Sequence, residues 1–131
     1  MVTSPNYPDN YPDNFKRTDV IQVESGKILR LEFTNFEVEF DSWCGDDYDY
    51  VYHDYDYVKI TDGNGTTLMD RSCGYSSYDP SHSYYFLPPS ITTSTNRVEI
   101  LFFTDGQETS TGWSLSWSAV TPGEKALLVL N

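Results

Sequence analysis

The sequence is poor in alanine, cysteine and basic residues, and it has no long apolar run. Its 131 residues include two alanines, two cysteines and eight Lys and Arg, against 20 Asp and Glu. No apolar run approaches the roughly 20 residues that a membrane-spanning helix needs. The scarcity of alanine, with seven prolines and eight glycines, argues against helices. The net charge of −12 argues against nucleic acid or an anionic membrane as partner, because both are polyanions.

Aromatic residues, in contrast, are abundant, with 11 Tyr, 7 Phe and 3 Trp. Acidic chains that stay unfolded are poor in aromatics, so the composition indicates a folded domain. Apolar and polar residues alternate in several short segments separated by turn residues, which is typical of half-buried strands in a sandwich. The alternation is clearest in Leu29–Phe33, Phe36–Phe40 and Trp113–Ser118. Tyr57–Ile60 and the more apolar Arg97–Phe103 are predicted strands as well.

These segments predict an all-β fold with two antiparallel sheets. The length suits one domain around a single core, since domains most often have about 100–150 residues. We expect this domain to cover residues 1–120. Residues 121–131, which begin with Thr121-Pro122-Gly123, are expected to form a linker or tail.

The negative charge is concentrated in one acidic segment, Glu37–Asp56, which has eight carboxylates and no Lys or Arg. It therefore carries −8 of the net charge of −12. The segment includes most of a short repeat, Asp47–His53 followed by Asp54–Ile60, which we interpret as a local duplication that lengthens a loop. On charge alone, the segment is either a solvated acidic face without a ligand or a binding site for cations or basic protein surfaces.

The two cysteines, Cys44 and Cys73, have neither the spacing of a zinc site nor that of a Cys-x-x-Cys redox pair. They form either one disulfide or two buried thiols. The disulfide would close a loop of about 30 residues and stabilise the fold by roughly 3–4 kcal/mol. A disulfide implies a secreted or lumenal protein. Asn64-Gly65-Thr66 is a glycosylation acceptor triplet in a predicted exposed turn, which agrees with that location.

Several motifs, taken in order along residues 2–120, resemble the pattern of CUB domains. The motifs are Ser4–Pro12, Phe36–Glu39, Cys44, Tyr55–Ile60, Cys73-Gly74, Phe102–Asp105 and Gly112-Trp113. The resemblance implies an all-β sandwich of jelly-roll type. The first of the two usual family disulfides is missing, and Arg17 or a neighbour stands where its second cysteine would fall. In this respect the chain looks most like the N-terminal CUB domains of complement-type and lectin-pathway serine proteases.

The resemblance also implies a Ca²⁺ site with three carboxylate ligands, Glu39, Asp56 and Asp105. In the family pattern a tyrosine that matches Tyr11 braces the site, and the backbone carbonyl at Gln107 can coordinate as well. Ca²⁺ takes six to eight oxygen ligands, so carboxylates from separate segments suit it. Asp49 lies in an identical Tyr-Asp-Tyr-Val sequence. We prefer Asp56 because Lys59–Gly63 continues the family pattern after it.

Three classes of function are open at this stage. The family resemblance implies an extracellular, calcium-dependent protein-interaction module, one domain of a larger secreted protein, whose acidic site receives a basic residue, often Lys, from the partner. The alternative is a glycan-binding single-domain protein of the seminal-plasma type, in which exposed tyrosines stack on sugars: Tyr48, Tyr50, Tyr52, Tyr75 and Tyr78. An enzyme is not expected, because no nucleophile elbow or His-Glu-x-x-His motif occurs and neither His53 nor His82 has a visible catalytic partner.

Overall fold

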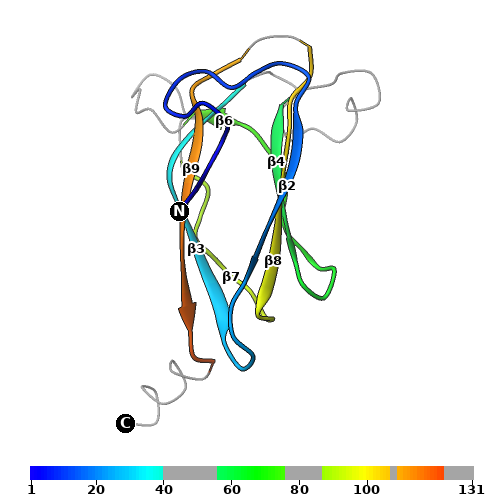
Figure 1. The fold of residues 1–131 in the computed structure, drawn as a ribbon, viewed down its shortest axis with the longest axis vertical. Helices are drawn as coiled ribbons and strands as arrows, with labels where there is room; N and C mark the ends of the chain where they lie inside the picture. The colour runs from blue at the N-terminus through cyan, green and yellow to red at the C-terminus, as the bar shows by residue number, and fades with distance from the viewer. Residues whose placement is uncertain (40–55, 76–86, 107–108, 123–131) are drawn as a thin grey trace.

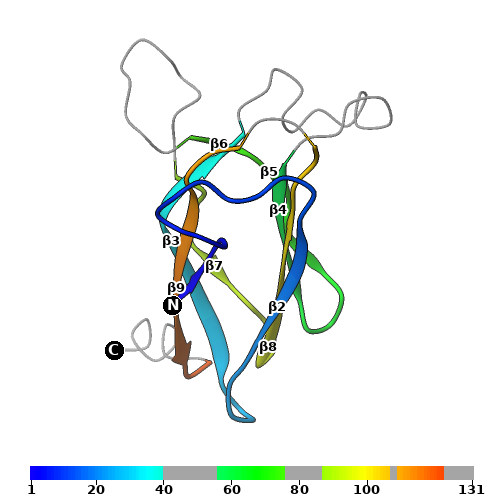
Figure 2. The same cartoon turned by 45° about the horizontal axis from the view of Figure 1, so that its top comes forward.

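The computed structural model describes residues 1–39, 56–75, 87–106 and 109–122, and in these ranges every regular element is a β-strand. The strands form two antiparallel sheets packed face to face (Figures 1 and 2). This arrangement confirms the predicted all-β sandwich. The described residues form no helix that is long and apolar enough to cross a membrane.

The first sheet is built around two long strands, β3 (Ile28–Val38) and β9 (Gly112–Val120). Its strand order is β1-β9-β3-β6, and β7 also pairs with β3. The short strands are β1 (Val2–Thr3), β6 (Gly74–Tyr75) and β7 (Ile91–Thr92). Because β9 is the last strand and β1 the first, this sheet brings the two ends of the domain together.

The second sheet has the order β2-β8-β4-β5. Its strands are β2 (Lys16–Gln22), β4 (Tyr57–Asp62), β5 (Thr67–Ser72) and β8 (Arg97–Phe103). β8, the most apolar of the predicted strands, lies between β2 and β4, and its inner residues Val98, Ile100 and Phe102 are fully buried. β4 and β8 run antiparallel, with Tyr57 opposite Phe103 and Asp62 opposite Val98.

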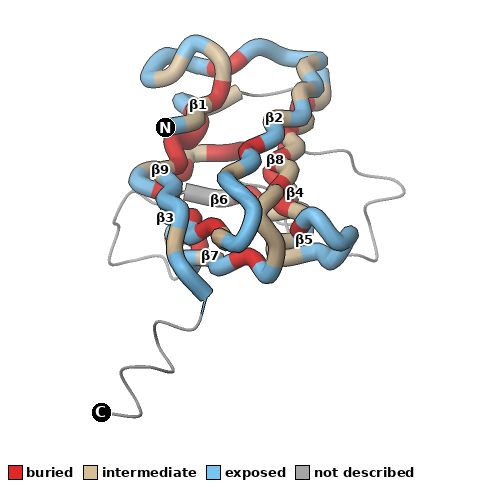
Figure 3. Tube along the Cα trace, turned by 60° about the horizontal axis from the view of Figure 1, so that its bottom comes forward, coloured by how far each residue is buried: buried red, intermediate tan, exposed pale blue. Residues whose placement is uncertain are grey.

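The core consists of buried apolar residues from both sheets. Figure 3 shows the buried positions in red along the strands. The largest fully buried side chains of the core include Trp113, Tyr11, Phe36 and Phe102. Phe102 makes edge-to-face contacts with Tyr11, at 4.9 Å between ring centroids, and with Trp113, at 5.7 Å. Tyr11 does not belong to a strand, so the opening segment of the chain is packed into one end of the core.

Arg17 lies at or next to the position at which the resemblance would place a second family cysteine. Its Nη2 atom donates a hydrogen bond to the carbonyl oxygen of Thr3 at 2.6 Å, and its Nε atom donates to Asp19 at 2.8 Å. Arg17 belongs to β2 of one sheet and Thr3 to β1 of the other. A non-covalent link therefore joins the edge strands of the two sheets where the disulfide is missing.

Asp62 anchors the turn between β4 and β5 at the end of the sandwich where β8 begins. Its buried carboxylate accepts hydrogen bonds from the backbone N–H of Ser94 at 2.7 Å, from the Ser94 hydroxyl at 2.8 Å and from the Thr95 hydroxyl at 2.6 Å. Burial raises the pKa of Asp62, but these hydrogen bonds outweigh burial and hold the pKa below its usual value of 3.8.

We expect Asp62 to make the fold acid-sensitive. Because its folded-state pKa is lowered, its contribution to stability is present above about pH 4 and is lost as the pH falls through the folded-state value. Replacing Asp62 by Asn should therefore reduce the loss of unfolding free energy between pH 6 and pH 3, measured by urea denaturation. The matched control, Asp70→Asn, changes an exposed carboxylate on β5 and should keep the wild-type loss. An equal loss in the wild type and Asp62→Asn would contradict the prediction.

Candidate metal centre

Three carboxylates meet at one end of the sandwich, at the points where three strands begin or end. Glu39 follows the last residue of β3, Asp56 precedes the first residue of β4, and Asp105 lies two residues beyond the end of β8. β3 belongs to one sheet, and β4 and β8 belong to the other. The antiparallel topology places the end of β3, the start of β4 and the end of β8 at the same end of the sandwich (Figure 2). Carboxylates that are far apart in the sequence are thereby brought together.

The three side chains form a compact carboxylate cluster. One carboxylate oxygen from each of Glu39, Asp56 and Asp105 lies within 4.8 Å of the others. Glu39 is 5% exposed and Asp56 0% exposed, while Asp105 is partly exposed. The cluster is therefore open to solvent mainly at Asp105.

Tyr11 bridges two members of the carboxylate cluster. Its hydroxyl group donates a hydrogen bond to Oδ2 of Asp56 at 2.7 Å and accepts one from the backbone N–H of Glu39 at 3.0 Å. Because the Tyr11 side chain is 1% exposed, this bridge is shielded from water. It fixes the end of β3 relative to the start of β4.

Backbone groups complete the positioning of the three carboxylates. The backbone N–H of Asp56 donates to Oε1 of Glu39 at 3.0 Å, and the backbone N–H of Asp105 donates to Oδ1 of Asp56 at 2.8 Å. Each of these hydrogen bonds joins two different segments of the chain. The members of the carboxylate cluster thus help to position one another.

The opening segment also holds Asp105 in place, through residues that the sequence analysis missed. The backbone N–H of Asn14 donates to the carbonyl oxygen of Asp105 at 2.7 Å. The Thr104 hydroxyl accepts from the backbone N–H of Phe15 at 2.8 Å and donates to the carbonyl of Pro12 at 2.9 Å. Asn14 has a positive φ of 55°, a conformation in which Asn is enriched. Its sequence position gives no other signal of this role.

The electrostatics of the cluster favour the uptake of positive charge. Burial is the largest cause that raises the pKa of Asp56, and the Asp105 side chain and the charge of Glu39 raise it further, to about 8. The hydrogen bonds from Tyr11 and from the Asp105 backbone oppose this shift. Burial, together with the hydrogen bond to Asp56, also raises the pKa of the Tyr11 hydroxyl. Negative charge in the cluster is therefore costly unless a proton or another cation neutralises it.

The donor set of the cluster fits a hard divalent cation. Carboxylate oxygens are the ligands that Ca²⁺ and Mg²⁺ prefer, and Ca²⁺–O distances are about 2.3–2.6 Å. Two ligands on opposite sides of one Ca²⁺ ion are thus at most about 5 Å apart. The three oxygens, all within 4.8 Å of one another, satisfy this limit. Glu39, Asp56 and Asp105 could therefore share one ion.

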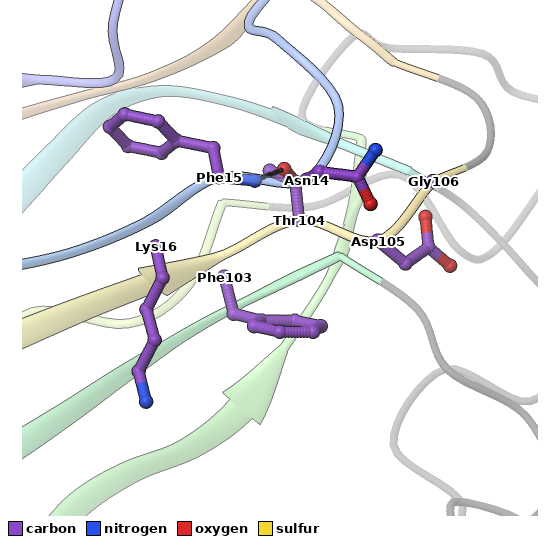
Figure 4. A pocket seen from close by; sticks show the side chains of 7 residues that line it. All are labelled: Asn14, Phe15, Lys16, Phe103, Thr104, Asp105 and Gly106. Carbon is purple, nitrogen blue, oxygen red and sulfur yellow. Dashed lines mark hydrogen bonds between the residues drawn. The ribbon is translucent and has the colours of Figure 1, made fainter.

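A cavity of about 340 Å³ opens beside Asp105 (Figure 4). Figure 4 shows Asp105 and Lys16 on different sides of the Phe103 ring, so the cavity wall carries both signs of charge. Its lining residues are Asn14, Phe15, Lys16, Phe103, Thr104, Asp105 and Gly106. The cavity lies next to the exposed side of the carboxylate cluster.

Several predicted site residues lie outside the described part of the chain. These are Gln107, Cys44 and Asp49, together with the tyrosines of the glycan-binding alternative, Tyr48, Tyr50, Tyr52 and Tyr78; the side chain of Tyr75 is also not described. Cys73 is buried, 8% exposed, and no free cysteine occurs among the described residues. The pairing with Cys44 stays a prediction. Asn64 lies in the exposed turn between β4 and β5, at the other end of the molecule.

The fold and the carboxylate cluster define the class of this protein, a jelly-roll sandwich domain with a candidate metal site formed at one end. A family model described as "CUB domain" matches residues 1–117. The chain belongs to the CUB family, as the sequence motifs predicted.

Curated relatives include proteases of the kind that the missing disulfide indicated. The chain is 35% identical over 130 residues to the mouse complement C1r-B subcomponent, and 33% identical over 119 residues to mouse mannan-binding lectin serine protease 1. Rat cubilin is 29% identical over 120 residues. These alignments cover 96%, 90% and 92% of the chain, but only 16%, 14% and 3% of the respective relatives. The chain thus corresponds to a small part of each of these larger proteins.

Solved structures agree with the assignment. The CUB1-EGF-CUB2 domain of human MASP-1/3 matches with a TM-score of 0.72 and 27% identity, over 97% of this chain and 43% of that one. A crystal structure of the MASP-1 CUB2 domain bound to Ca²⁺ matches with a TM-score of 0.68 and 29% identity, over 88% of both chains. A related CUB domain therefore binds the ion that the donor set of this chain fits.

Proposed function

We propose that this domain is an extracellular, calcium-dependent protein-interaction module and part of a larger secreted protein. The carboxylate cluster is the observation that carries the proposal. Glu39, Asp56 and Asp105 would hold Ca²⁺, with Tyr11 bracing the site and the carbonyl of Gln107 as a further ligand. Bound Ca²⁺ would neutralise the buried charge and hold the ends of β3, β4 and β8 together.

The partner contact in this proposal is a basic residue, in the first place Lys. Glu39 and Asp105 each have two carboxylate oxygens, so both can coordinate an ion and still accept a hydrogen bond from an ammonium group. The exposed side of the cluster lies at Asp105, beside the cavity lined by Phe103 and Thr104. The acidic segment Glu37–Asp56 would speed encounter with a basic partner by long-range attraction.

The chain's own role in this proposal is binding, without catalysis. Secretion is supported by the predicted disulfide between Cys44 and Cys73, since disulfides persist in oxidising compartments. The domain is expected to cover residues 1–120, with residues 121–131 as a linker or tail. The homologous proteases, of which the chain matches 16% or less, would then carry their chemistry in other domains.

The partner contact can be tested with a minimal probe. We expect Nα-acetyl-lysine methylamide at millimolar concentration to shift the backbone amide NMR signals of Asp56 and Asp105 in calcium and not in a calcium chelator. The norleucine analogue has the same stem without the ammonium group and serves as the control. Equal shifts with both compounds, or no calcium dependence, would contradict a specific ammonium contact.

A further inference from the structure

The turn between β4 and β5 presents a modification site at the end of the sandwich opposite the carboxylate cluster. β4 runs from the cluster, at Asp56, to this turn (Figure 1). Asp62 lies six positions after Asp56 along extended chain, which corresponds to a distance of roughly 20 Å. Whatever is attached at the turn is thus kept away from a partner that approaches the cluster.

Asn64 is exposed, and both ends of its side-chain amide make hydrogen bonds at the surface of the turn. The backbone N–H of Thr66 donates to Oδ1 of Asn64 at 3.0 Å, which fixes the side-chain amide. Nδ2 of Asn64 makes one long hydrogen bond, of 3.3 Å, to the hydroxyl of Ser94. Nδ2 carries two hydrogens, so a substituent can replace one hydrogen while the other still donates to Ser94.

The surroundings of Asn64 leave room for a bulky substituent. All residues from Gly63 to Thr67 are exposed. A Cβ atom added at Gly65 would meet nothing within 4 Å. The turn is held by backbone hydrogen bonds between Asp62 and Thr66, at 2.8 Å, and between Gly65 and Asp62, at 2.9 Å. Its shape therefore does not depend on the substituent.

We propose that Asn64 carries an N-linked glycan. On the proposed function, in which the partner binds at the carboxylate cluster, this glycan lies at the opposite end of the domain. Asn64-Gly65-Thr66 is the only Asn-x-Ser/Thr triplet in the sequence. In the reaction Nδ2 of Asn64 loses a proton and forms a bond to the anomeric carbon of an oligosaccharide. The bond from that carbon to an isoprenoid diphosphate carrier breaks, and the carrier leaves with the electron pair.

The test is expression of residues 1–131 behind a signal sequence in a eukaryotic secretory host. The secreted wild-type chain should gain one discrete mass increment, which peptide N-glycosidase removes and leaves aspartate at position 64. Asn64→Gln and Thr66→Ala should lack the increment. Thr66→Ser keeps the hydroxyl that the triplet requires and should retain it. A secreted wild-type chain without glycan, or a glycan retained in Thr66→Ala, would overturn the proposal.

The position of the glycan is tested separately from its presence. Glycosylated and enzymatically deglycosylated protein should show the same calcium-induced shift in thermal unfolding, because the turn lies at the opposite end from the carboxylate cluster. A calcium shift that changes on deglycosylation would overturn the placement. The absence of any calcium shift in both forms would count against the proposed metal site alone, since the mass measurement does not depend on calcium.

Discussion

Calcium at about 10 mM is expected to raise the midpoint of thermal unfolding by roughly 5–12 °C relative to chelator. Extracellular calcium sites bind with dissociation constants of roughly 10⁻⁴–10⁻³ M. If calcium binds only the folded state, it then raises the free energy of unfolding by about 1.4–2.7 kcal/mol. For a domain of this size, 1 kcal/mol corresponds to roughly 3–5 °C. Calorimetry or circular dichroism with and without calcium measures the shift directly.

Two variants separate a specific site from a general effect of cations on an acidic protein. Asp105→Asn removes one charge from the carboxylate cluster and should abolish most of the calcium shift. Glu32→Gln removes one charge from an exposed carboxylate on β3 that pairs with Arg30 and should leave the shift unchanged. Equal calcium shifts in both variants would indicate non-specific screening of the net charge, contrary to a site at Glu39, Asp56 and Asp105.

Replacing Asp56 by Ala is expected to lower the free energy of unfolding by about 2 kcal/mol or more in the absence of calcium. The change removes the acceptor for the buried Tyr11 hydroxyl and for the backbone N–H of Asp105. Each buried donor left unsatisfied costs about 1–3 kcal/mol, and relief of the buried charge offsets part of this cost. Urea denaturation in chelator measures the difference.

The matched variant Asp56→Asn nearly preserves the volume and one acceptor oxygen. It should lose less stability than Asp56→Ala in chelator, because Oδ1 can still accept the hydrogen bond from Asp105. Both variants should lose the calcium response, so their deficit relative to the wild type should grow when calcium is added. A wild-type calcium shift in Asp56→Asn would show that Asp56 is not a calcium ligand. Wild-type stability of Asp56→Ala in chelator would contradict the stabilising role of the Asp56 hydrogen bonds.

Local sequence patterns predicted the strands well where one face is apolar and the other polar. Trp113–Ser118 alternates strictly and Arg97–Phe103 is the most apolar predicted strand, and the structure has β9 and β8 at these positions. The alternation changes phase between Phe33 and Phe36. The structure has one continuous strand there, β3, with an irregular register opposite β9 between Phe33 and Asn35. The phase change alone does not identify a bulge, because a bulge is defined by the partner strand.

The residues of the candidate site were predicted from family motifs and not from strand periodicity. Glu39, Asp56 and Asp105 match motifs of the CUB family, and the structure brings these three residues and Tyr11 together. Asn14 and Thr104 were missed because Asn14 acts through its own backbone N–H and the Thr104 hydroxyl bonds only to backbone groups of the opening segment. Such contacts have no side-chain pattern that a single sequence reveals.

The sequence by itself determined that the chain is an acidic, all-β domain whose charge is concentrated in Glu37–Asp56. It did so because composition and two-residue periodicity are local properties, which can be recognised without knowing which residues are in contact in the fold. Only the tertiary structure decided which carboxylates are buried and lie close together. Asp105 lies 49 residues from Asp56, and its backbone N–H reaches the Asp56 carboxylate because β8 ends beside the start of β4. Burial and the pKa shift of Asp56 follow from that pairing, which no local pattern contains.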